Sequence, residues 1–230
     1  DIPSIEHRLT RKGRVELGVG AAQITRGESL RMVKKGHLPL TELAELAYST
    51  IDDLLGWNVV PPTVLRITSD GERMVSAQEY IPDALDLEDI MEELGDIRWD
   101  RERFRKELFQ RVDRRRLMQI ALLDMVLGQT DRHSSNVVVD EQGRPWAIDN
   151  EASLERTWKR PEDFEIHFVR AEAFHHVPIP SDMLTDLRNL DKGNFYAALA
   201  GFDREIINAA WTRKQALVRA GKFPGPLANL

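Results

Sequence analysis

A short segment near the middle of the chain carries three polar side chains suited to phosphate chemistry: Asp131, Asn136 and Asp149. Residues 137–139 are expected to form a strand, and residues 145–148 a returning strand after a tight turn. Because the centre of that turn lies midway between Asn136 and Asp149, pairing of the strands is expected to bring these two side chains together. An amide oxygen beside a carboxylate suits a hard divalent cation, and a second carboxylate, Asp131, suits activation of a hydroxyl nucleophile. The segment therefore indicates phosphoryl transfer.

Composition excludes several other classes of function. The 230 residues are 42% hydrophobic and 30% charged, as in an ordinary globular protein. A formal net charge of -6 argues against broad nucleic-acid binding. The sequence has no cysteine, which excludes disulfides, thiol catalysis and zinc–thiolate sites.

No stretch of the sequence has the pattern of a membrane span. The most apolar one, residues 118–127, is shorter than the ~20 residues that a span needs, and Asp124 interrupts it. The N-terminus has no apolar segment typical of a signal peptide, so a soluble, cytoplasmic location is expected. Because the chain starts at Asp1 rather than Met, loss of a leader stays open, and the oligomeric state is not predicted.

The first third of the chain has the pattern of a small sheet with one helix. Short stretches of alternating apolar and polar residues, separated by turn signals, predict strands. The expected strands are residues 5–9, 14–19, 29–34, 63–68 and 73–78. Among them, an apolar stripe at helical spacing predicts a helix that Thr41 caps and Gly56 ends.

The rest of the chain is mainly helical in pattern. Asp86 and Asp100 are expected to cap the first two of its helices. The expected helices are residues 86–94, 100–127, 181–190 and 203–220. A strand-rich lobe, a short crossing segment and a helical lobe together predict an α+β fold.

The central segment resembles the catalytic region of the phosphatidylinositol 3-/4-kinase-like branch of the protein-kinase superfamily. The shared pattern is Asp131-Arg132-His133-x-x-Asn136, then a hairpin ending in Ile148-Asp149. Upstream stretches of the sequence resemble those of a bacterial subgroup of kinase-like proteins. The Asp149-Asn150 pair, at the position where protein kinases have Asp-Phe-Gly, is also similar to that subgroup. These stretches lie around Glu45, at residues 55–57, at 60–64 and at 78–84.

The resemblance covers roughly residues 34–154 and implies a bilobal protein-kinase-like fold. It implies a small strand-rich N-terminal lobe with one helix (residues 1–78), a hinge (79–84) and a mainly helical catalytic lobe (85–230).

The resemblance also implies roles for the polar residues, with ATP and Mg²⁺ as cofactors. Asp131 would orient the acceptor hydroxyl and take its proton, and His133 would lie near the transferred phosphate. Asn136 and Asp149 would hold Mg²⁺.

The nucleotide is expected to contact the hinge and the N-terminal lobe. The hinge backbone that could pair with the adenine edge comprises Gln78, Glu79, Tyr80 and Ile81. Glu45 would anchor a lysine that contacts the phosphates. Lys34 is preferred because it is in phase with its predicted strand, and Lys35 and Lys12 stay open. The phosphate-covering turn could be residues 10–13 or 17–20.

The acceptor is left open among a lipid head group, a protein Ser/Thr and a small molecule. A kinase-like pseudoenzyme acting as a binding module is one alternative, and nucleotidyl transfer on the same scaffold is another. The basic residues of segment 111–116 are expected to be a solvated helix face offset by acids. His167, His175 and His176 lack a convincing ligand set for a metal. Arg156, Lys159 and Arg160 could attract an anionic head group or form a plain solvated loop.

Overall fold

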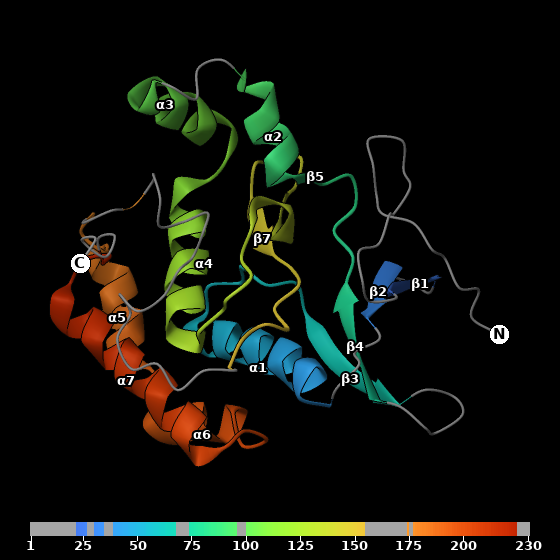
Figure 1. The fold of residues 1–230 in the computed structure, drawn as a ribbon, viewed down its shortest axis with the longest axis vertical. Coiled ribbons are helices and arrows are strands. Elements are labelled where there is room, and N and C mark those ends of the chain that lie inside the picture. Colours follow the sequence, from blue (N-terminus) through green and yellow to red (C-terminus); the bar gives the residue numbers. More distant parts are fainter. Residues whose placement is uncertain are drawn as a thin grey trace.

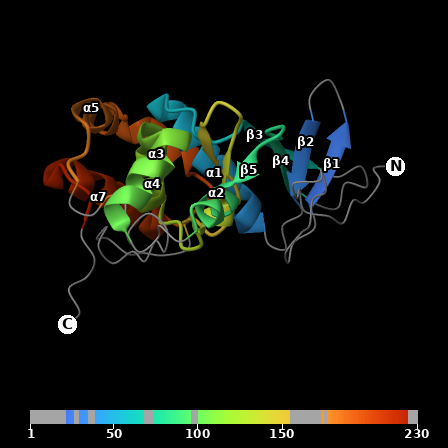
Figure 2. The same cartoon turned by 90° about the horizontal axis from the view of Figure 1, so that it is seen from above.

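The four-stranded sheet lies at one end of the molecule, helices α3 to α7 at the other, and helix α1 and a small second sheet between them (Figures 1 and 2). The computed structural model describes residues 22–26, 30–34, 39–67, 74–95, 100–154, 174 and 177–224, with the backbone alone for 22–26, 30–34, 39 and 101. The predicted strands at 5–9 and 14–19 lie outside these residues. None of the described helices is long and apolar enough to cross a membrane.

The sheet of the first lobe has the strand order β1-β2-β4-β3, with every neighbouring pair antiparallel. Its strands are β1 (Ala22–Arg26), β2 (Leu30–Lys34), β3 (Thr63–Ile67) and β4 (Met74–Glu79). Three of them confirm predicted strands to within a residue. Strand β1 was not predicted, because Thr25-Arg26-Gly27 was interpreted as a turn.

Helix α1 (Pro39–Leu55) packs against both β3 and β4. It begins before Thr41, so the predicted cap at Thr41 is wrong. Pro39 suits the first helical turn because the N–H it lacks would have no helical partner there. The predicted end is confirmed, since Gly56 follows the helix with a left-handed φ of +67°.

The long helix predicted over residues 100–127 is two helices, α3 (Arg101–Arg111) and α4 (Arg114–Leu127). Val112 between them is extended, and Asp113 caps α4 by accepting hydrogen bonds from the backbone N–H groups of Arg115 and Arg116. The N–H of Asp113 donates to the carbonyl of Gly143 at 2.8 Å. The apolar pattern of the sequence does not predict this tertiary contact, because the apolar spacing continues across the break.

A three-stranded sheet, β5-β6-β7, joins the lobes. Strands β6 (Val137–Val139) and β7 (Pro145–Ala147) form the predicted hairpin, and β5 (Leu85–Asp86) was not predicted. Val137 pairs with Ala147, so the register is one residue away from the expected one. Asn136 consequently lies opposite Ile148, whose N–H donates to the Asn136 carbonyl at 3.1 Å.

Of the remaining helices, the last packs against α4 and the one before it against α1. Asp86 is at the N-cap of α2 (Leu87–Glu93), though without a side-chain bond to its N–H groups. Helices α5 (Ser181–Asn189) and α7 (Arg204–Ala220) confirm predicted ones, and the short α6 (Lys192–Ala198) was not predicted. The apolar faces meet in one core cluster that includes Tyr48, Leu122 and Phe195, each with none of its surface exposed.

A buried carboxylate fixes the turn that follows α1. One oxygen of Asp52 accepts hydrogen bonds from the N–H groups of Val59 and Val60, both at 2.9 Å. The other oxygen is buried and has no hydrogen-bond partner among the described residues. Burial raises the pKa of Asp52 to about 7, although the two N–H groups and Arg116 lower it.

This raised pKa makes stability depend on pH. The folded protein holds the Asp52 proton more tightly than the unfolded chain, so its stabilising effect is full below the ordinary pKa of 3.8 and is lost as pH rises through about 7. Between those values the free energy of unfolding should fall by about 1.4 kcal/mol per pH unit from this group alone. Urea unfolding of the wild type and Asp52→Asn from pH 5 to 8.5 measures the effect. The free energy of unfolding of the wild type, relative to that of Asp52→Asn, should be highest at low pH and should fall as pH rises to about 7. A difference between the two proteins that is the same at every pH would contradict the assignment.

Candidate active site

The loop with the predicted catalytic residues follows α4 directly (Figure 1). Gly128 ends α4 with a left-handed φ of +77°, which glycine adopts without steric cost. The chain then runs through the 3-10 turn Ser134–Asn136 into β6. Asp131 and His133 are exposed in this loop and Asn136 is buried. The predicted base and histidine are therefore accessible from solvent.

The amide of Asn136 is held in one orientation. Its Nδ2 donates to the backbone carbonyl of Asp131 at 2.9 Å, and its own N–H donates to the carbonyl of His133 at 3.0 Å. With Nδ2 occupied, Oδ1 is the atom left to act as an acceptor or a ligand. This is the orientation that a metal ligand needs.

Asp149 follows β7 with a left-handed φ of +56°, which residues other than glycine rarely adopt. Its side chain is partly exposed. The unusual backbone ends the extended run of β7 and turns the chain at a predicted ligand. Strained backbone of this kind is common at functional sites.

The Gln129 side chain forms hydrogen bonds with the backbone of both predicted carboxylate residues, Asp131 and Asp149. Its side-chain Oε1 accepts from the N–H of Asp131 at 2.9 Å, and its Nε2 donates to the carbonyl of Asp149 at 3.1 Å. The residue has no exposed surface, and both bonds are partly buried. One amide side chain thus fixes the backbone of Asp131 relative to that of Asp149.

Arg132 is the centre of the site's buried polar network. Its Nε lies 3.2 Å from both carboxylate oxygens of Asp124 on α4. Its Nη1 donates to the carbonyls of Asn136, at 2.8 Å, and Ile148. Its Nη2 donates to Asp124, at 3.1 Å, and to Oδ1 of Asn150. One guanidinium therefore holds the loop after α4, the end of the hairpin and α4 itself in a fixed arrangement.

The Arg132–Asp124 ion pair has no exposed surface. Burial raises the pKa of Asp124. For Arg132, burial is the largest single cause and lowers the pKa, but the charges and hydrogen bonds of Asp124 and Tyr48 together outweigh it and raise the pKa of the guanidinium. Tyr48 of α1 donates its hydroxyl to Asp124, and burial raises the pKa of that hydroxyl well above its usual value. Every charge in the network has a hydrogen-bonded partner, which buried charges require.

Helix α1 reaches the same network through Glu45. Its carboxylate accepts from the backbone N–H of Asn150 at 2.9 Å and from its Nδ2 at 3.2 Å. Asn150 has no exposed surface and Glu45 only 4%. The residue after Asp149 therefore links α1 to Arg132, so α1 and the loop after α4 are joined through buried bonds.

The part of the predicted site that belongs to the N-terminal lobe is only partly described. Lys34 closes β2 opposite Ser76 of β4, and the Ser76 N–H donates to the buried carboxylate of Glu42 on α1. The Lys34 side chain lies outside the described residues, as do Lys12 and Lys35 and both candidate phosphate-covering turns. Its pairing with Glu45 stays a prediction.

The predicted hinge begins inside a strand. Gln78 and Glu79 belong to β4, where the Gln78 side chain donates to the Thr63 hydroxyl at 3.0 Å. Tyr80 and Ile81 follow the strand and are partly exposed. Gln78 and Glu79 therefore form the strand end, and the connection between lobes runs from Tyr80 to β5.

The basic residues of segment 111–116 have local partners. Arg111 pairs with Glu93 at 2.9 Å, and Arg115 pairs with Asp182. Arg114 lies over the ring of Phe109 and Arg116 over the ring of Trp146. Of the residues weighed as other sites, His167, His175, His176, Arg156, Lys159 and Arg160 lie outside the described residues.

Several site residues were not singled out from the sequence: Tyr48, Asp124, Gln129 and Asn150. Asp124 could have been found, because a lone acid in the apolar run of α4 must be paired if it is buried. Gln129, Tyr48 and Asn150 carry no such signal, since their roles depend on tertiary contacts.

The fold is kinase-like. The chain is similar to the Helicobacter pylori proinflammatory kinase CtkA, with a TM-score of 0.64 and 13% identity over 92% of this chain and 93% of that one. It is also similar to a chain of the Shewanella oneidensis MR-1 toxin–antitoxin complex of HipA, HipB and operator DNA. There the TM-score is 0.51 and the identity 13%, over 89% of this chain and 63% of the other. No family model and no curated protein matches the sequence. The predicted α+β kinase-like fold is confirmed.

Proposed function

We propose that the chain is an ATP- and Mg²⁺-dependent phosphotransferase that moves the γ-phosphate to a hydroxyl acceptor. The observation that carries the proposal is the oriented set at the end of α4: exposed Asp131, Asn136 with its amide oxygen available, and Asp149 tied to Asp131 through Gln129. The kinase-like fold supports it. The Asp131-Arg132-His133 motif favours a bacterial subgroup similar to the phosphatidylinositol 3-/4-kinases.

The residues of the loop would share the work of the transfer. Asp131 would accept a hydrogen bond from the acceptor hydroxyl and take its proton as the hydroxyl attacks phosphorus. His133, exposed two residues later, would donate a hydrogen bond to the phosphate being transferred. Arg132 contacts no reactant in this scheme and positions the loop.

The residues present fit a magnesium ion. Asn136 and Asp149 supply an amide and a carboxylate oxygen, the hard ligands that Mg²⁺ prefers. The fixed amide orientation of Asn136 supports this role. When bound, Mg²⁺ would offset negative charge on the nucleotide phosphates. In the described part of the chain, no three His, Asp or Glu side chains converge as a separate metal cluster.

The nucleotide would lie between the lobes, with its adenine edge at the hinge backbone of Gln78, Glu79, Tyr80 and Ile81. Glu45 would hold a lysine against the phosphates, and Lys34 is the preferred candidate because it closes β2, which pairs with β4, and α1 packs against β4. The short link from Tyr80 to β5 supports the division into lobes at residues 1–78, 79–84 and 85–230.

Binding of ATP should require Mg²⁺ and Asp149. At a hundredfold excess over Kd, ATP with Mg²⁺ should raise the melting temperature by roughly 5–10 °C. Asp149→Asn should lose most of this shift, because it removes a charged ligand. The matched control is Asp89→Asn, on a partly buried carboxylate of α2, which should retain the full shift. A shift that is independent of Mg²⁺, or unchanged in Asp149→Asn, would contradict the metal assignment.

The binding-module alternative shares the fold but needs no proton acceptor. This alternative would gain support if ATP bound as expected but its γ-phosphate was not transferred to any acceptor tested. Nucleotidyl transfer would instead release pyrophosphate and place the adenosine monophosphate group on the acceptor.

A further inference from the structure

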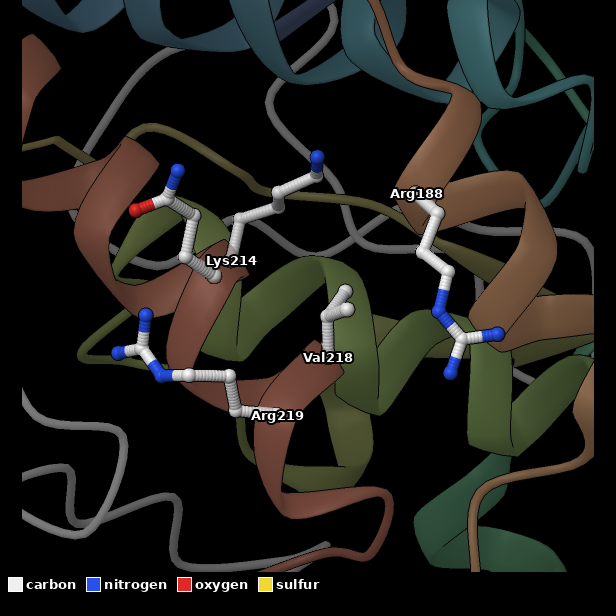
Figure 3. Close-up of a pocket in the computed structure, with 5 residues that line it drawn as sticks. Arg188, Lys214, Val218 and Arg219 are labelled. Carbon is white, nitrogen blue, oxygen red and sulfur yellow. The ribbon is translucent and has the colours of Figure 1, made fainter.

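A basic pocket lies between helices α5 and α7, which carry none of the residues assigned to phosphate transfer. Its volume is about 260 Å³, and it is lined by Arg188, Lys214, Gln215, Val218 and Arg219. Figure 3 shows Val218 between Arg188, on α5, and the α7 side chains of Lys214 and Arg219. Three cationic side chains therefore border one small hollow.

These cations have no acidic partner among the residues that the structure describes. The described ion pairs use other cations, Arg111, Arg115, Arg132 and Arg144. The whole chain has a formal net charge of -6, so acids are plentiful elsewhere. A hollow bordered by cations that form no ion pair within the described part of the chain is expected to attract anions.

Lys214 distinguishes the pocket from a scatter of surface cations. Only 5% of the residue is exposed, and its Nζ lies 4.2 Å from the centre of the Trp211 ring. No hydrogen bond joins this ammonium to another described residue. Burial lowers the pKa of Lys214, because the charged form loses hydration that no carboxylate replaces. An anion in the pocket would give this ammonium a charged partner.

We propose that this pocket binds a small phosphate-bearing molecule. Guanidinium groups match the oxygens of a phosphate with paired N–H donors, and an ammonium adds a compact charge. A volume of about 260 Å³ is below the range of ~300–1,000 Å³ usual for drug-sized ligands, so it suits a compact phosphate rather than a peptide. The proposal does not depend on the proposed enzymatic function.

Inorganic pyrophosphate is a suitable probe, titrated calorimetrically without Mg²⁺ at an ionic strength fixed with sodium chloride. Arg188→Gln and Lys214→Met should each weaken binding about tenfold or more, the effect of losing one charge-assisted hydrogen bond. Arg111→Gln, which removes an exposed cation already paired with Glu93, should bind as the wild type does.

Each outcome decides the proposal. Equal binding by the wild type and Arg188→Gln, or no binding at all, would overturn it. Arg188 is exposed, so this variant decides the matter even if Lys214→Met fails to fold. Comparison with a sugar phosphate separates an organic phosphate ester from free polyphosphate. Binding of a phosphopeptide but not of pyrophosphate would overturn the small-ligand assignment.

Discussion

Replacing Asp131 by Asn is expected to lower the rate of phosphoryl transfer on the order of 10²–10⁴-fold, the usual contribution of a general base. The amide keeps the shape of the side chain but cannot take the hydroxyl proton. The backbone bonds of residue 131 to Gln129 and Asn136 do not involve the altered group, so the loop should keep its structure. Steady-state rates and the ATP-induced melting shift, measured on the same preparation, test this.

The expected pattern is a large loss of kcat with an unchanged melting shift. Asp89→Asn should keep both quantities at the level of the wild type. A rate within tenfold of the wild type would show that Asp131 is not the proton acceptor. Joint loss of rate and ATP binding would show that Asp131 acts in the binding of nucleotide.

Replacing Arg132 by Met is expected to cost roughly 3–5 kcal/mol of stability, because it leaves the carboxylate of Asp124 buried without its countercharge. For a chain of this length that corresponds to a fall in melting temperature of roughly 6–20 °C. The carbonyls of Asn136 and Ile148 lose a donor as well. Urea unfolding gives the free energy directly.

A double variant distinguishes the effect of the unpaired Asp124 charge from the effect of the hydrogen bonds that the loop loses. Asp124→Leu in the Arg132→Met background should restore part of the stability, since an apolar pair can replace a buried ion pair. It should not restore activity, because the loop carbonyls and Asn150 still lack the guanidinium. Arg111→Met, which breaks an exposed pair, should cost no more than about 1 kcal/mol. Loss of less than about 1 kcal/mol in Arg132→Met would mean that the network is not a principal support of the fold.

Local patterns predicted the elements that depend on local chemistry. The end of α1 at Gly56, the hairpin of β6 and β7, and helices α5 and α7 all follow from turn glycines and apolar spacing. The break between α3 and α4 was missed because it depends on the bond between Asp113 and Gly143, far apart in sequence. The register of the hairpin was one residue off because the turn alone does not fix which residues pair.

The site shows the same division. The side chains that we propose to carry the chemistry lie in one short segment, so their types and spacing were visible in the sequence. Their supports come from elsewhere: Tyr48 and Glu45 from α1, Asp124 from α4 and Asn150 from beyond the hairpin. No single segment contains that network, and only the fold brings it together.

The central claim is that the site moves the γ-phosphate of ATP, and isotope transfer tests it most directly. The protein is incubated with Mg²⁺ and ATP labelled either at the γ-phosphate or in the adenosine, with a heated cell extract as the source of acceptors. The γ-label should appear on an acceptor or on the protein itself, the adenosine label should not, and Asp131→Asn should abolish the transfer. Transfer of the adenosine label, or equal γ-label transfer by the wild type and Asp131→Asn, would contradict the proposed function.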